Sequence, residues 1–404
     1  MRKRIAVVGN GMAGLRFVEE LVAAAPGQFD ITVIGAEPQP AYNRVLLSPL
    51  LAGEIGLEDV SLKPADWYAA HGVTLLTGAP VTVLDTYNRS IIVENADGGM
   101  EIYFDACVLA TGSNPIRLTL PGDTLDGVLT FRTTADVDAM SQFAQIGQPA
   151  VVIGGGLLGI EAAYGLARAG IPVTLVHIMD RLMERQLDPE GALYLKGALE
   201  AKGIRVILGA QTKEILGETR VESVILSDGQ KIDCGLVVMA VGVQANTKLA
   251  VSAGLVIGRG IIVDEGLQTT APNIFAIGEC AEYRGICHGL VEPAYEQAKV
   301  LADCFAGRTS AYGGSVPAAN LKVSGVPVFS VGNFSSDDAE VLVTRDAGLE
   351  TYRKLCVREG QLVGAVLVGD TTDALWYLDL IRSGADITAF RDSLAFGRAY
   401  AEAA

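Results

Sequence analysis

The chain has 404 residues, of which half are hydrophobic, and its formal net charge is −16. This length exceeds that of one typical domain, so we expect two or three domains with a sizeable core. The acidic charge argues against nucleic acids and anionic membrane surfaces as partners.

The first predicted elements are a strand, a glycine-rich loop and a helix. Ile5–Val8 is an apolar run of strand length, Gly9-Asn10-Gly11-Met12-Ala13-Gly14 follows it directly, and Leu15–Ala25 has few helix breakers. In a G-x-G-x-x-G loop the first glycine permits a tight turn, the second lets a pyrophosphate approach the backbone, and the third lets helix and strand pack closely. The helix N-terminus then offers free N–H groups to the phosphates.

A second predicted strand, Ile31–Ile34, ends near Glu37. A carboxylate at this place accepts hydrogen bonds from ribose hydroxyls. A glycine motif alone also fits an ordinary turn, but strand, helix and acid together predict dinucleotide binding. Arg44 follows in the segment Ala41–Ser48. Its planar guanidinium suits a phosphate, and a surface arginine in a loop is the alternative interpretation.

The remainder of this first unit ends in small residues. We predict a helix at Asp66–His71, a strand at Val73–Leu76 and a small antiparallel element around Val81–Leu84, Ile91–Glu94 and Ile102–Phe104. The apolar strand Ala106–Leu109 then runs into Ala110-Thr111-Gly112-Ser113. Small residues at a strand end let the backbone reach a ligand at the carboxyl edge of a sheet.

The same order of elements returns roughly 145 residues later. Ala150–Ile153 leads into Gly154-Gly155-Gly156-Leu157-Leu158-Gly159, a helix to about Ala169 and a strand at Val173–Val176. Two such units are far more specific than one, because chance would have to produce the spacing twice. They predict two dinucleotides bound side by side.

His177 stands where an acid would hold the second ribose. A carboxylate there would repel the 2′-phosphate of NADPH, and a histidine removes that repulsion. This residue therefore predicts no preference for NADH over NADPH. A histidine that merely ends a strand is the alternative.

The chain then completes the second unit and returns to the first. We predict a helix at Asp188–Lys202 and strands at Ile204–Leu208, Thr212–Leu216, Val221–Leu226 and Leu236–Ala240, the last ending in Val241-Gly242. Strands at Ile261–Val263 and Ile274–Ile277 follow, the latter ending at Gly278-Glu279, and then a helix at Glu292–Phe305. The tail has alternating strand patterns from Leu321 to Val363, a helix at Ala374–Ser383 and no nucleotide motif, which predicts a separate packing domain.

These motifs resemble the two-dinucleotide flavoprotein reductases. Four strings look more closely like the amino-terminal flavoprotein module of assimilatory NAD(P)H nitrite reductases, which is also similar to the diaphorase (electron transfer) subunit of some bacterial assimilatory nitrate reductases. The resemblance covers essentially the whole chain. The strings are Gly9–Gly14, Ala41–Val45, Leu182-Met183-Glu184-Arg185-Gln186-Leu187-Asp188 and Val366-Leu367-Val368-Gly369-Asp370-Thr371.

The resemblance implies an α/β fold with two Rossmann-like domains, the NAD(P)H domain inserted in the FAD domain, and a C-terminal α+β interface domain. The implied bounds are 1–115 with 246–314 for FAD, 116–245 for NAD(P)H and 315–404 for the interface domain. FAD is implied beside Gly9, Gly11, Met12, Ala13, Gly14, Glu37, Arg44, Ser48, Thr111, Gly112, Gly278 and Glu279. NADH or NADPH is implied beside Gly154, Gly156, Leu157, Leu158, Gly159, His177 and Gly242, with Glu161 next to the nicotinamide ring.

Three positions depart from related reductases. Pro49 stands where ferredoxin and rubredoxin reductases often carry a lysine after the serine that matches Ser48, so that flavin contact is lost or replaced. Many relatives have proline where Ala245 stands, and most of the wider superfamily has aspartate where Glu279 stands.

The cysteines exclude a thiol mechanism. Disulfide reductases of this architecture need a cysteine pair near the flavin, after the Arg44 loop, and peroxidases and oxidases need one cysteine there; the first cysteine here is Cys107. Cys280 adjoins the flavin acid without a partner, which favours a packing role. With no C-x-x-C and only three histidines, we expect no metal site. The basic N-terminus becomes a strand at once, so we expect no signal peptide and a cytoplasmic location.

The resemblance therefore implies hydride transfer from NAD(P)H to FAD, with orientation and electrostatics supplied by the protein. The longer nitrite reductases continue into a cysteine cluster and a sirohaem domain, and the sequence to Ala404 has neither. We expect electrons to pass to a separate metalloenzyme, an assimilatory nitrate or nitrite reductase, with residues 315–404 as a docking or a hetero- or homo-oligomer surface. The alternatives are a rubredoxin or ferredoxin reductase, which would use a small iron–sulfur carrier, and a nucleotide-sensing flavoprotein with structural FAD.

Overall fold

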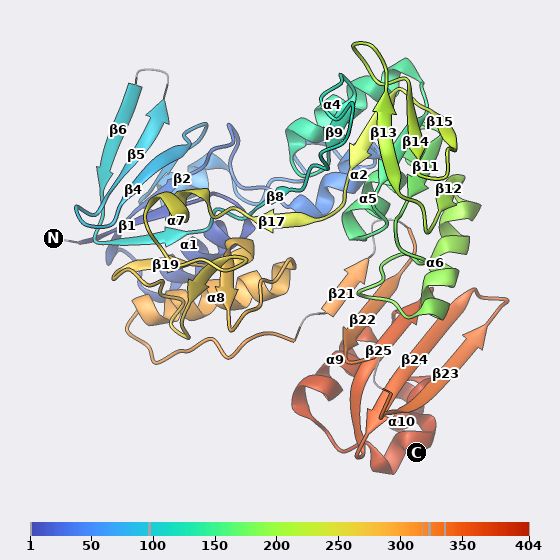
Figure 1. The fold of residues 1–404 in the computed structure, drawn as a ribbon. Coiled ribbons are helices and arrows are strands. Elements are labelled where there is room, and N and C mark those ends of the chain that lie inside the picture. Colours follow the sequence, from blue (N-terminus) through green and yellow to red (C-terminus); the bar gives the residue numbers. More distant parts are fainter. Residues whose placement is uncertain (1, 96–97, 317, 322–324, 335–336, 404) are drawn as a thin grey trace. The chain divides into compact units, whose positions relative to one another are not determined.

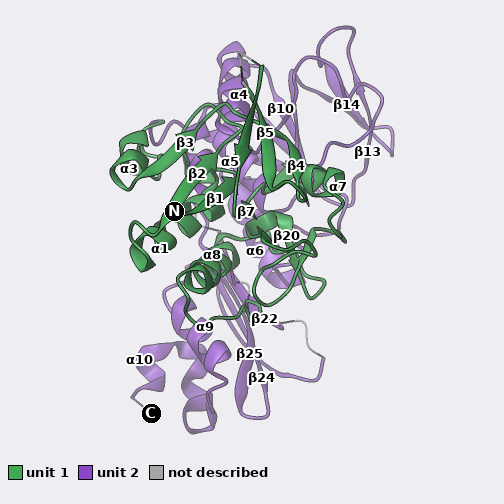
Figure 2. Ribbon diagram, turned by 90° about the vertical axis from the view of Figure 1, so that its left-hand side faces the viewer, with its two compact units in different colours: residues 1–44, 57–114, 243–315 green, residues 45–56, 115–242, 316–404 purple. Residues whose placement is uncertain are grey.

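A computed structural model describes residues 2–95, 98–316, 318–321, 325–334 and 337–403. The chain forms two compact units (Figure 2). Unit 1 comprises residues 1–44, 57–114 and 243–315, and unit 2 comprises residues 45–56, 115–242 and 316–404. These bounds differ from the expected domains, because residues 45–56 and 316–404 belong with 115–242; the domain assignment stays a prediction.

Unit 1 is built on a five-stranded parallel sheet with the order β19-β7-β1-β2-β3. The helix α1 (Met12–Ala24) connects β1 to β2 and buries Leu15, Phe17, Val18 and Leu21. Strand β7 is buried at every residue, as expected for a parallel sheet covered on both faces. The strands are β1 (Lys3–Val8), β2 (Phe29–Ile34), β3 (Val73–Leu76), β7 (Ala106–Leu109) and β19 (Ile274–Ala276).

Smaller elements complete unit 1. Strands β4 (Val81–Asp85), β5 (Ser90–Asn95) and β6 (Gly98–Tyr103) form the predicted antiparallel sheet between β3 and β7. Helix α8 (Val291–Phe305) packs on α1 and brings Phe305 to Phe17, with ring centroids 5.6 Å apart. The remaining elements are α3 (Ala65–Ala70), β8 (Ser113–Pro115), β17 (Val243–Ala245), α7 (Lys248–Ser252), β18 (Ile261–Val263), η2 (Gly278–Cys280) and β20 (Ala281–Tyr283).

Unit 2 repeats this plan. Its parallel sheet has the order β12-β11-β10-β16-β9, and helix α5 (Leu157–Arg168) connects β10 to β11 as α1 connects β1 to β2 (Figure 1). A three-stranded antiparallel sheet again stands between the third strand and the returning strand. The parallel strands are β9 (Val128–Thr130), β10 (Ala150–Ile153), β11 (Val173–Val176), β12 (Ile204–Ile207) and β16 (Leu236–Met239); the antiparallel ones are β13 (Thr212–Leu216), β14 (Ser223–Leu226) and β15 (Lys231–Asp233).

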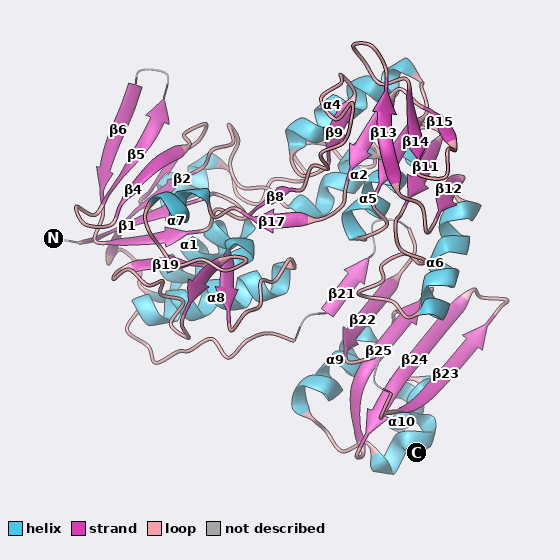
Figure 3. Cartoon of the chain, in the orientation of Figure 1, coloured by secondary structure: helices cyan, strands magenta, loops and turns pink. Residues whose placement is uncertain are grey.

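The C-terminal part of unit 2 is a five-stranded antiparallel sheet with the order β21-β22-β25-β24-β23 (Figure 3). Helix α9 (Ala374–Ser383) packs on one face and buries Tyr377 and Leu378 there. Helix α6 (Pro189–Ala201) contacts β24 and β25, and Tyr194 stacks on Tyr352 with ring centroids 5.6 Å apart. The strands are β21 (Ala318–Leu321), β22 (Val328–Gly332), β23 (Glu340–Asp346), β24 (Thr351–Arg358) and β25 (Gln361–Val368).

The predicted α/β class and most predicted elements are confirmed. The sequence interpretation did not predict α2 (Leu47–Leu51), α4 (Thr134–Ile146) and the C-terminal turns η3 (Thr388–Phe396) and α10 (Arg398–Ala401). Parts of the predicted strand pattern of the tail, residues 322–324 and 335–336, lie outside the described residues. Within the described ranges, no helix is both long and apolar enough to cross a membrane.

Candidate dinucleotide-binding sites

The first glycine loop is shaped by two close backbone contacts. Gly9 has φ +115°, and a Cβ on it would lie 2.1 Å from the carbonyl oxygen of Ala110, at the end of β7. A Cβ on Gly14 would lie 2.1 Å from the carbonyl oxygen of Gly9. Both distances are far below van der Waals contact, so only glycine lets the strand ends and the helix approach this closely.

The middle glycine has the opposite environment. A Cβ on Gly11 would meet no atom within 4 Å, so the position is open. Met12 and Ala13 are the first residues of α1, and the helix cap has no side-chain hydrogen bond. Their N–H groups have no intrahelical acceptor. An open backbone surface beside free N–H groups fits a pyrophosphate.

Glu37 lies beyond β2 in a polar cluster. Its carboxylate accepts a hydrogen bond from the Tyr42 hydroxyl at 2.6 Å and forms an ion pair with Arg44. The Arg44 guanidinium also donates to the Tyr42 oxygen at 2.8 Å and lies 4.8 Å from the centre of that ring. The structure therefore joins the predicted ribose acid to the predicted phosphate clamp.

The other predicted residues of this unit gather at the ends of β7 and β19. The Ser113 hydroxyl donates to Glu279 at 2.8 Å, and the Thr111 hydroxyl donates to the carbonyl oxygen of Asn246 at 2.7 Å. A Cβ on Gly278 would lie 2.8 Å from the Cβ of Ala13, so η2 packs against the first turn of α1. Gly112 takes φ +66°, in the left-handed region.

The second glycine loop reproduces the first. A Cβ on Gly154 would lie 2.2 Å from the carbonyl oxygen of Ala240, and one on Gly159 would lie 1.8 Å from that of Gly154. A Cβ on Gly156 would meet nothing within 4 Å. Leu157 and Leu158 open α5, whose cap again lacks a side-chain hydrogen bond, and Gly242 follows β16 with φ +124°. Unit 2 thus carries a second surface that fits a pyrophosphate.

Glu161 lies in α5 with its side chain buried. Burial raises the pKa of this carboxyl to about 8, because the charged form loses its hydration. Its backbone oxygen accepts a hydrogen bond from Ser48 at 2.9 Å. The carboxyl is therefore mostly protonated at neutral pH and is able to donate a hydrogen bond.

Ser48 lies on α2, in the segment of unit 2 that packs on α5. Leu51 of the same helix fits against Gly165, where a Cβ would lie 2.9 Å from a Leu51 methyl carbon. The Ser48 hydroxyl is thus bound to α5, whereas the other residues predicted to contact FAD lie in unit 1. Its predicted flavin contact stays a prediction.

His177 follows β11 and is buried. Its Nδ1 accepts a hydrogen bond from the N–H of Gly155 at 3.0 Å, and its Nε2 lies 3.1 Å from a carboxylate oxygen of Glu184. Sequence reasoning named the string Leu182–Asp188 for its resemblance but gave Glu184 no role, because it lies seven residues beyond His177 and no periodicity places it at the glycine loop.

The cysteines form no disulfide. Cys280 is fully buried and its sulfur lies 3.4 Å from the carbonyl oxygen of Leu109; burial raises the pKa of its thiol. Burial also raises the pKa of Cys107 to about 12. Both thiols are therefore protonated and poor nucleophiles at neutral pH. The described residues contain no group of three or more histidine, cysteine or acidic side chains able to hold a metal ion.

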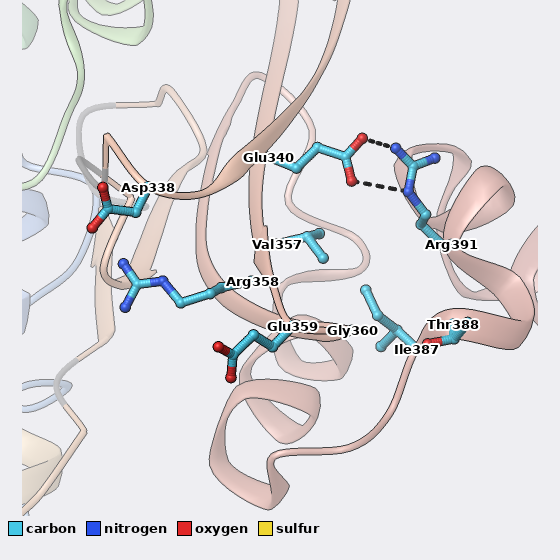
Figure 4. Close-up of a pocket in the computed structure, with 9 residues that line it drawn as sticks. All are labelled: Asp338, Glu340, Val357, Arg358, Glu359, Gly360, Ile387, Thr388 and Arg391. Atoms are coloured by element: carbon cyan, nitrogen blue, oxygen red, sulfur yellow. Dashed lines mark hydrogen bonds and ion pairs between the residues drawn. The ribbon is translucent and has the colours of Figure 1, made fainter.

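A cavity of about 650 Å³ lies in the C-terminal part of unit 2, and its lining includes no residue of a glycine loop. Ion pairing between Glu340 and Arg391 bridges one side of it (Figure 4). Its charged groups have both signs and no glycine loop borders it, so we give it no part in dinucleotide binding. The lining residues are Asp338, Glu340, Val357, Arg358, Glu359, Gly360, Ile387, Thr388 and Arg391.

Two family models and several curated proteins match this sequence. The family model for pyridine nucleotide-disulphide oxidoreductases matches residues 3–300, and that for the rubredoxin NAD+ reductase C-terminal domain matches residues 317–385. The chain is 44% identical to the nitrite reductase [NAD(P)H] of Bacillus subtilis, over 96% of this chain and 48% of that protein. It is 41% identical to the assimilatory nitrate reductase electron transfer subunit of the same organism, over 96% of this chain and 50% of that protein.

The chain therefore spans about half the length of these curated relatives. Among solved structures, a ferredoxin reductase from Rhodopseudomonas palustris superposes with a TM-score of 0.85 at 29% identity, over 94% of this chain and 95% of that one. The family model covers well over half of the sequence. The chain belongs to the pyridine nucleotide-disulphide oxidoreductase family.

Proposed function

We propose that this chain is an NAD(P)H-dependent FAD reductase, a diaphorase, that passes electrons to a metal centre of a nitrate or nitrite reductase. The observation that carries the proposal is the pair of matching glycine loops, each with an open middle glycine, Gly11 in one and Gly156 in the other. The similarity to a nitrite reductase and to a nitrate reductase electron transfer subunit supports the choice of acceptor.

In this proposal residues 1–115 and 246–314 bind FAD, residues 116–245 bind NAD(P)H, and residues 315–404 form the interface domain. The first glycine loop and α1 hold the FAD pyrophosphate, Glu37 holds its ribose, and Arg44 holds a phosphate. Thr111, Gly112, Gly278 and Glu279 line the sheet edge at which the rest of the cofactor lies. The second glycine loop holds the NAD(P)H pyrophosphate.

The two bound cofactors supply the redox chemistry: NAD(P)H gives two electrons with a proton, and FAD can release electrons singly. The protein then needs no nucleophile. The side chains bind and orient the reactants and exclude water. A protonated Glu161 would be able to donate a hydrogen bond at the nicotinamide end of the site without placing a negative charge there. The protonated, buried Cys280 takes no part.

Two other functions remain as alternatives. A rubredoxin or ferredoxin reductase would run the same chemistry with a small iron–sulfur carrier, and the match of residues 317–385 to the rubredoxin NAD+ reductase C-terminal domain favours this one. A nucleotide-sensing protein with structural FAD would be reduced slowly and would not turn over.

The test is anaerobic reduction followed by reoxidation. We expect NADH to bleach the flavin absorbance within seconds, and no consumption of nitrate or nitrite by residues 1–404 alone, since their described part holds no metal-binding cluster. Addition of an assimilatory nitrate or nitrite reductase metalloprotein should restore NADH-dependent turnover. Nitrate or nitrite reduction by the flavoprotein alone would refute the proposal, and rapid turnover with rubredoxin but with neither reductase would establish the first alternative.

A further inference from the structure

The register of the two units shows which residues occupy equivalent places. The N–H of Gly9 donates to the carbonyl oxygen of Ile34 at 2.8 Å, and the N–H of Gly154 donates to that of Val176 at 2.8 Å. His177 therefore corresponds to Gly35, not to Glu37. The position that corresponds to Glu37 is Met179, a side chain without hydrogen-bonding hydrogens. By register, no acid follows β11 at either place.

The two ring nitrogens of His177 are both engaged. A backbone N–H can only donate, so the Nδ1 atom that faces Gly155 carries no hydrogen and Nε2 carries it. Nε2–H then donates to Glu184. Since the side chain is also buried, His177 has no ring atom left for a ribose hydroxyl.

Glu184 is held against the same loop. The N–H of the preceding residue, Met183, donates to the carbonyl oxygen of Gly155 at 2.9 Å, and Met183 and Leu182 are fully buried. The Glu184 side chain keeps 26% of its surface exposed, and of its two carboxylate oxygens Oε2 faces His177. The Glu184 carboxylate therefore lies beside the second glycine loop, and its second oxygen, Oε1, does not take part in the hydrogen bond with His177.

The loop also carries cations that would suit a 2′-phosphate. Arg181 pairs with Asp180 at 3.1 Å, and its buried Nε has no hydrogen-bond partner in the described part of the chain. Arg185 follows Glu184 directly. Glu184, in contrast, is connected to the glycine loop by two hydrogen bonds in series, one to His177 and one from the N–H of Gly155 to His177.

We propose that Glu184, positioned by His177, accepts hydrogen bonds from the adenosine ribose hydroxyls of NADH and repels the 2′-phosphate of NADPH. The inference rests on the proposed function, because it assumes that the second glycine loop binds a nicotinamide dinucleotide. It assigns the role of the strand-end acid to a residue of the following loop, seven positions beyond His177. Glu184 is then a specificity-determining residue and His177 a positioning residue.

The test is Glu184→Gln in the full chain loaded with FAD. Steady-state rates with ferricyanide give kcat and KM for NADH and NADPH, and calorimetric titration with ADP-ribose measures nucleotide binding without electron transfer. A charged acceptor lost from a ribose hydroxyl costs about 10- to 100-fold in affinity. We expect the KM for NADH and the dissociation constant of ADP-ribose to rise by about that factor, with kcat within about two-fold and the KM for NADPH lowered.

Two comparisons separate positioning from general structural damage. Glu200→Gln removes an exposed glutamate that pairs with Lys196 on α6 and should change neither nucleotide's KM. His177→Ala should shift the NADH/NADPH ratio in the same direction as Glu184→Gln. His177→Gln should recover most of that ratio, because its amide N–H can still donate to Glu184.

The outcomes distinguish the inference from the function on which it rests. If the parent protein reduces its flavin with neither nucleotide, the proposed function fails and the inference with it. If NADH works but Glu184→Gln leaves the NADH/NADPH ratio unchanged, the inference alone is overturned. A parent that prefers NADPH, and loses that preference in Arg181→Gln, would also overturn it and give the role to the arginine.

Discussion

The two glycine units share strand order, loop geometry and helix placement. They differ in which segment supplies the side chain that lies between the glycine loop and the end of the second strand. In unit 1 the side chain of Asn10 occupies it, and Gly35 at the strand end leaves room; a Cβ on Gly35 would lie 3.1 Å from the Asn10 Cβ. In unit 2 the strand end supplies the side chain, His177, and the loop supplies the glycine; a Cβ on Gly155 would lie 2.6 Å from the imidazole ring.

The space between the glycine loop and the strand end holds one side chain, which comes from the loop in unit 1 and from the strand end in unit 2. Where the strand end fills it, that position is no longer available to face a ribose. The acid must then come from farther along the chain, and a motif that counts residues from the last glycine does not find it. A second contrast lies two residues beyond each motif, where α1 has the partly exposed Arg16 and α5 has the buried Glu161.

The largest effects are expected from glycine-to-alanine variants that disrupt one glycine loop and leave the other intact. Gly14→Ala and Gly159→Ala each drive a Cβ into a backbone carbonyl, and we expect about 3 kcal/mol or more of destabilisation from such overpacking. Gly11→Ala and Gly156→Ala meet no protein atom and should fold normally while obstructing the pyrophosphate. Flavin content should fall in Gly11→Ala alone, and the KM for NADH should rise in Gly156→Ala alone.

Thermal unfolding and flavin absorbance measure these four variants. Flavin loss in Gly156→Ala, with FAD retained in Gly11→Ala, would reverse the assignment of the two loops.

The next effect concerns the buried acid of α5. The folded-state pKa of Glu161 is raised, to about 8, so its stabilising contribution is complete below its unfolded pKa near 4.5, declines as pH rises between 4.5 and 8, and is absent above 8. Glu161→Gln removes the ionisation, so above pH 8 the variant should be more stable than the parent by up to about 5 kcal/mol.

Urea unfolding from pH 4.5 to 9 measures this difference, with Glu200→Gln as an exposed control that should leave the profile unchanged. An identical pH slope in parent and Glu161→Gln would show that the buried carboxyl does not titrate in this range.

Glu37 tests the ribose acid of unit 1 directly. Glu37→Ala removes a charged acceptor and leaves Arg44 and Tyr42 without their shared partner. We expect FAD affinity to fall by about 1.5–3 kcal/mol. Tyr42→Phe removes only one donor to Glu37 and should cost less. Flavin retained after dialysis measures both, and unchanged affinity in Glu37→Ala would refute the ribose assignment.

His177→Glu sharpens the comparison by placing an acid at the strand end of unit 2. We expect it to favour NADH over NADPH through repulsion of the 2′-phosphate, but only by a factor of about three or less, because the new carboxylate cannot donate the hydrogen bond that positions Glu184. In the double variant His177→Glu/Glu184→Gln a single charge remains, and the parent ratio should be nearly restored. The measurement is the ratio of kcat/KM for NADH to kcat/KM for NADPH. A lower ratio in His177→Glu than in the parent would contradict the expectation.

The smallest effect is expected at Cys280. Cys280→Ser should leave NADH-driven reduction of ferricyanide within about two-fold of the parent, because a serine hydroxyl can donate to the same backbone carbonyls, those of Leu109 and Ile277, as the buried thiol. Alkylation at pH 8 should be slow, since burial raises the pKa of this thiol. A charge-transfer band on two-electron reduction that vanishes in Cys280→Ser would instead establish a thiol role.

Much of this molecule follows from local sequence rules. The strands and glycine loops are predicted because apolar runs end in glycines at fixed spacing, and the helix expected at about 374–383 is present in the structure. Contacts between distant segments have no local signal in the sequence. The hydrogen bond between Ser113 and Glu279, for example, joins residues 166 positions apart, and no sequence pattern predicts it. Glu184 was missed for a related reason, because loops have no period from which a side chain's direction can be derived.

The string Leu182–Asp188 is fixed at both ends. Near one end, Glu184 forms a hydrogen bond with His177. At the other end, Asp188 caps α6 by accepting a hydrogen bond from the N–H of Gly191. Asp188 also accepts a hydrogen bond from the buried hydroxyl of Tyr352, on β24, at 2.7 Å. A protein docked on the C-terminal sheet and a nucleotide bound at Glu184 would thus act on the same seven residues. Thermodynamic linkage then requires reciprocity: whatever factor docking applies to NADH affinity, NADH applies to docking.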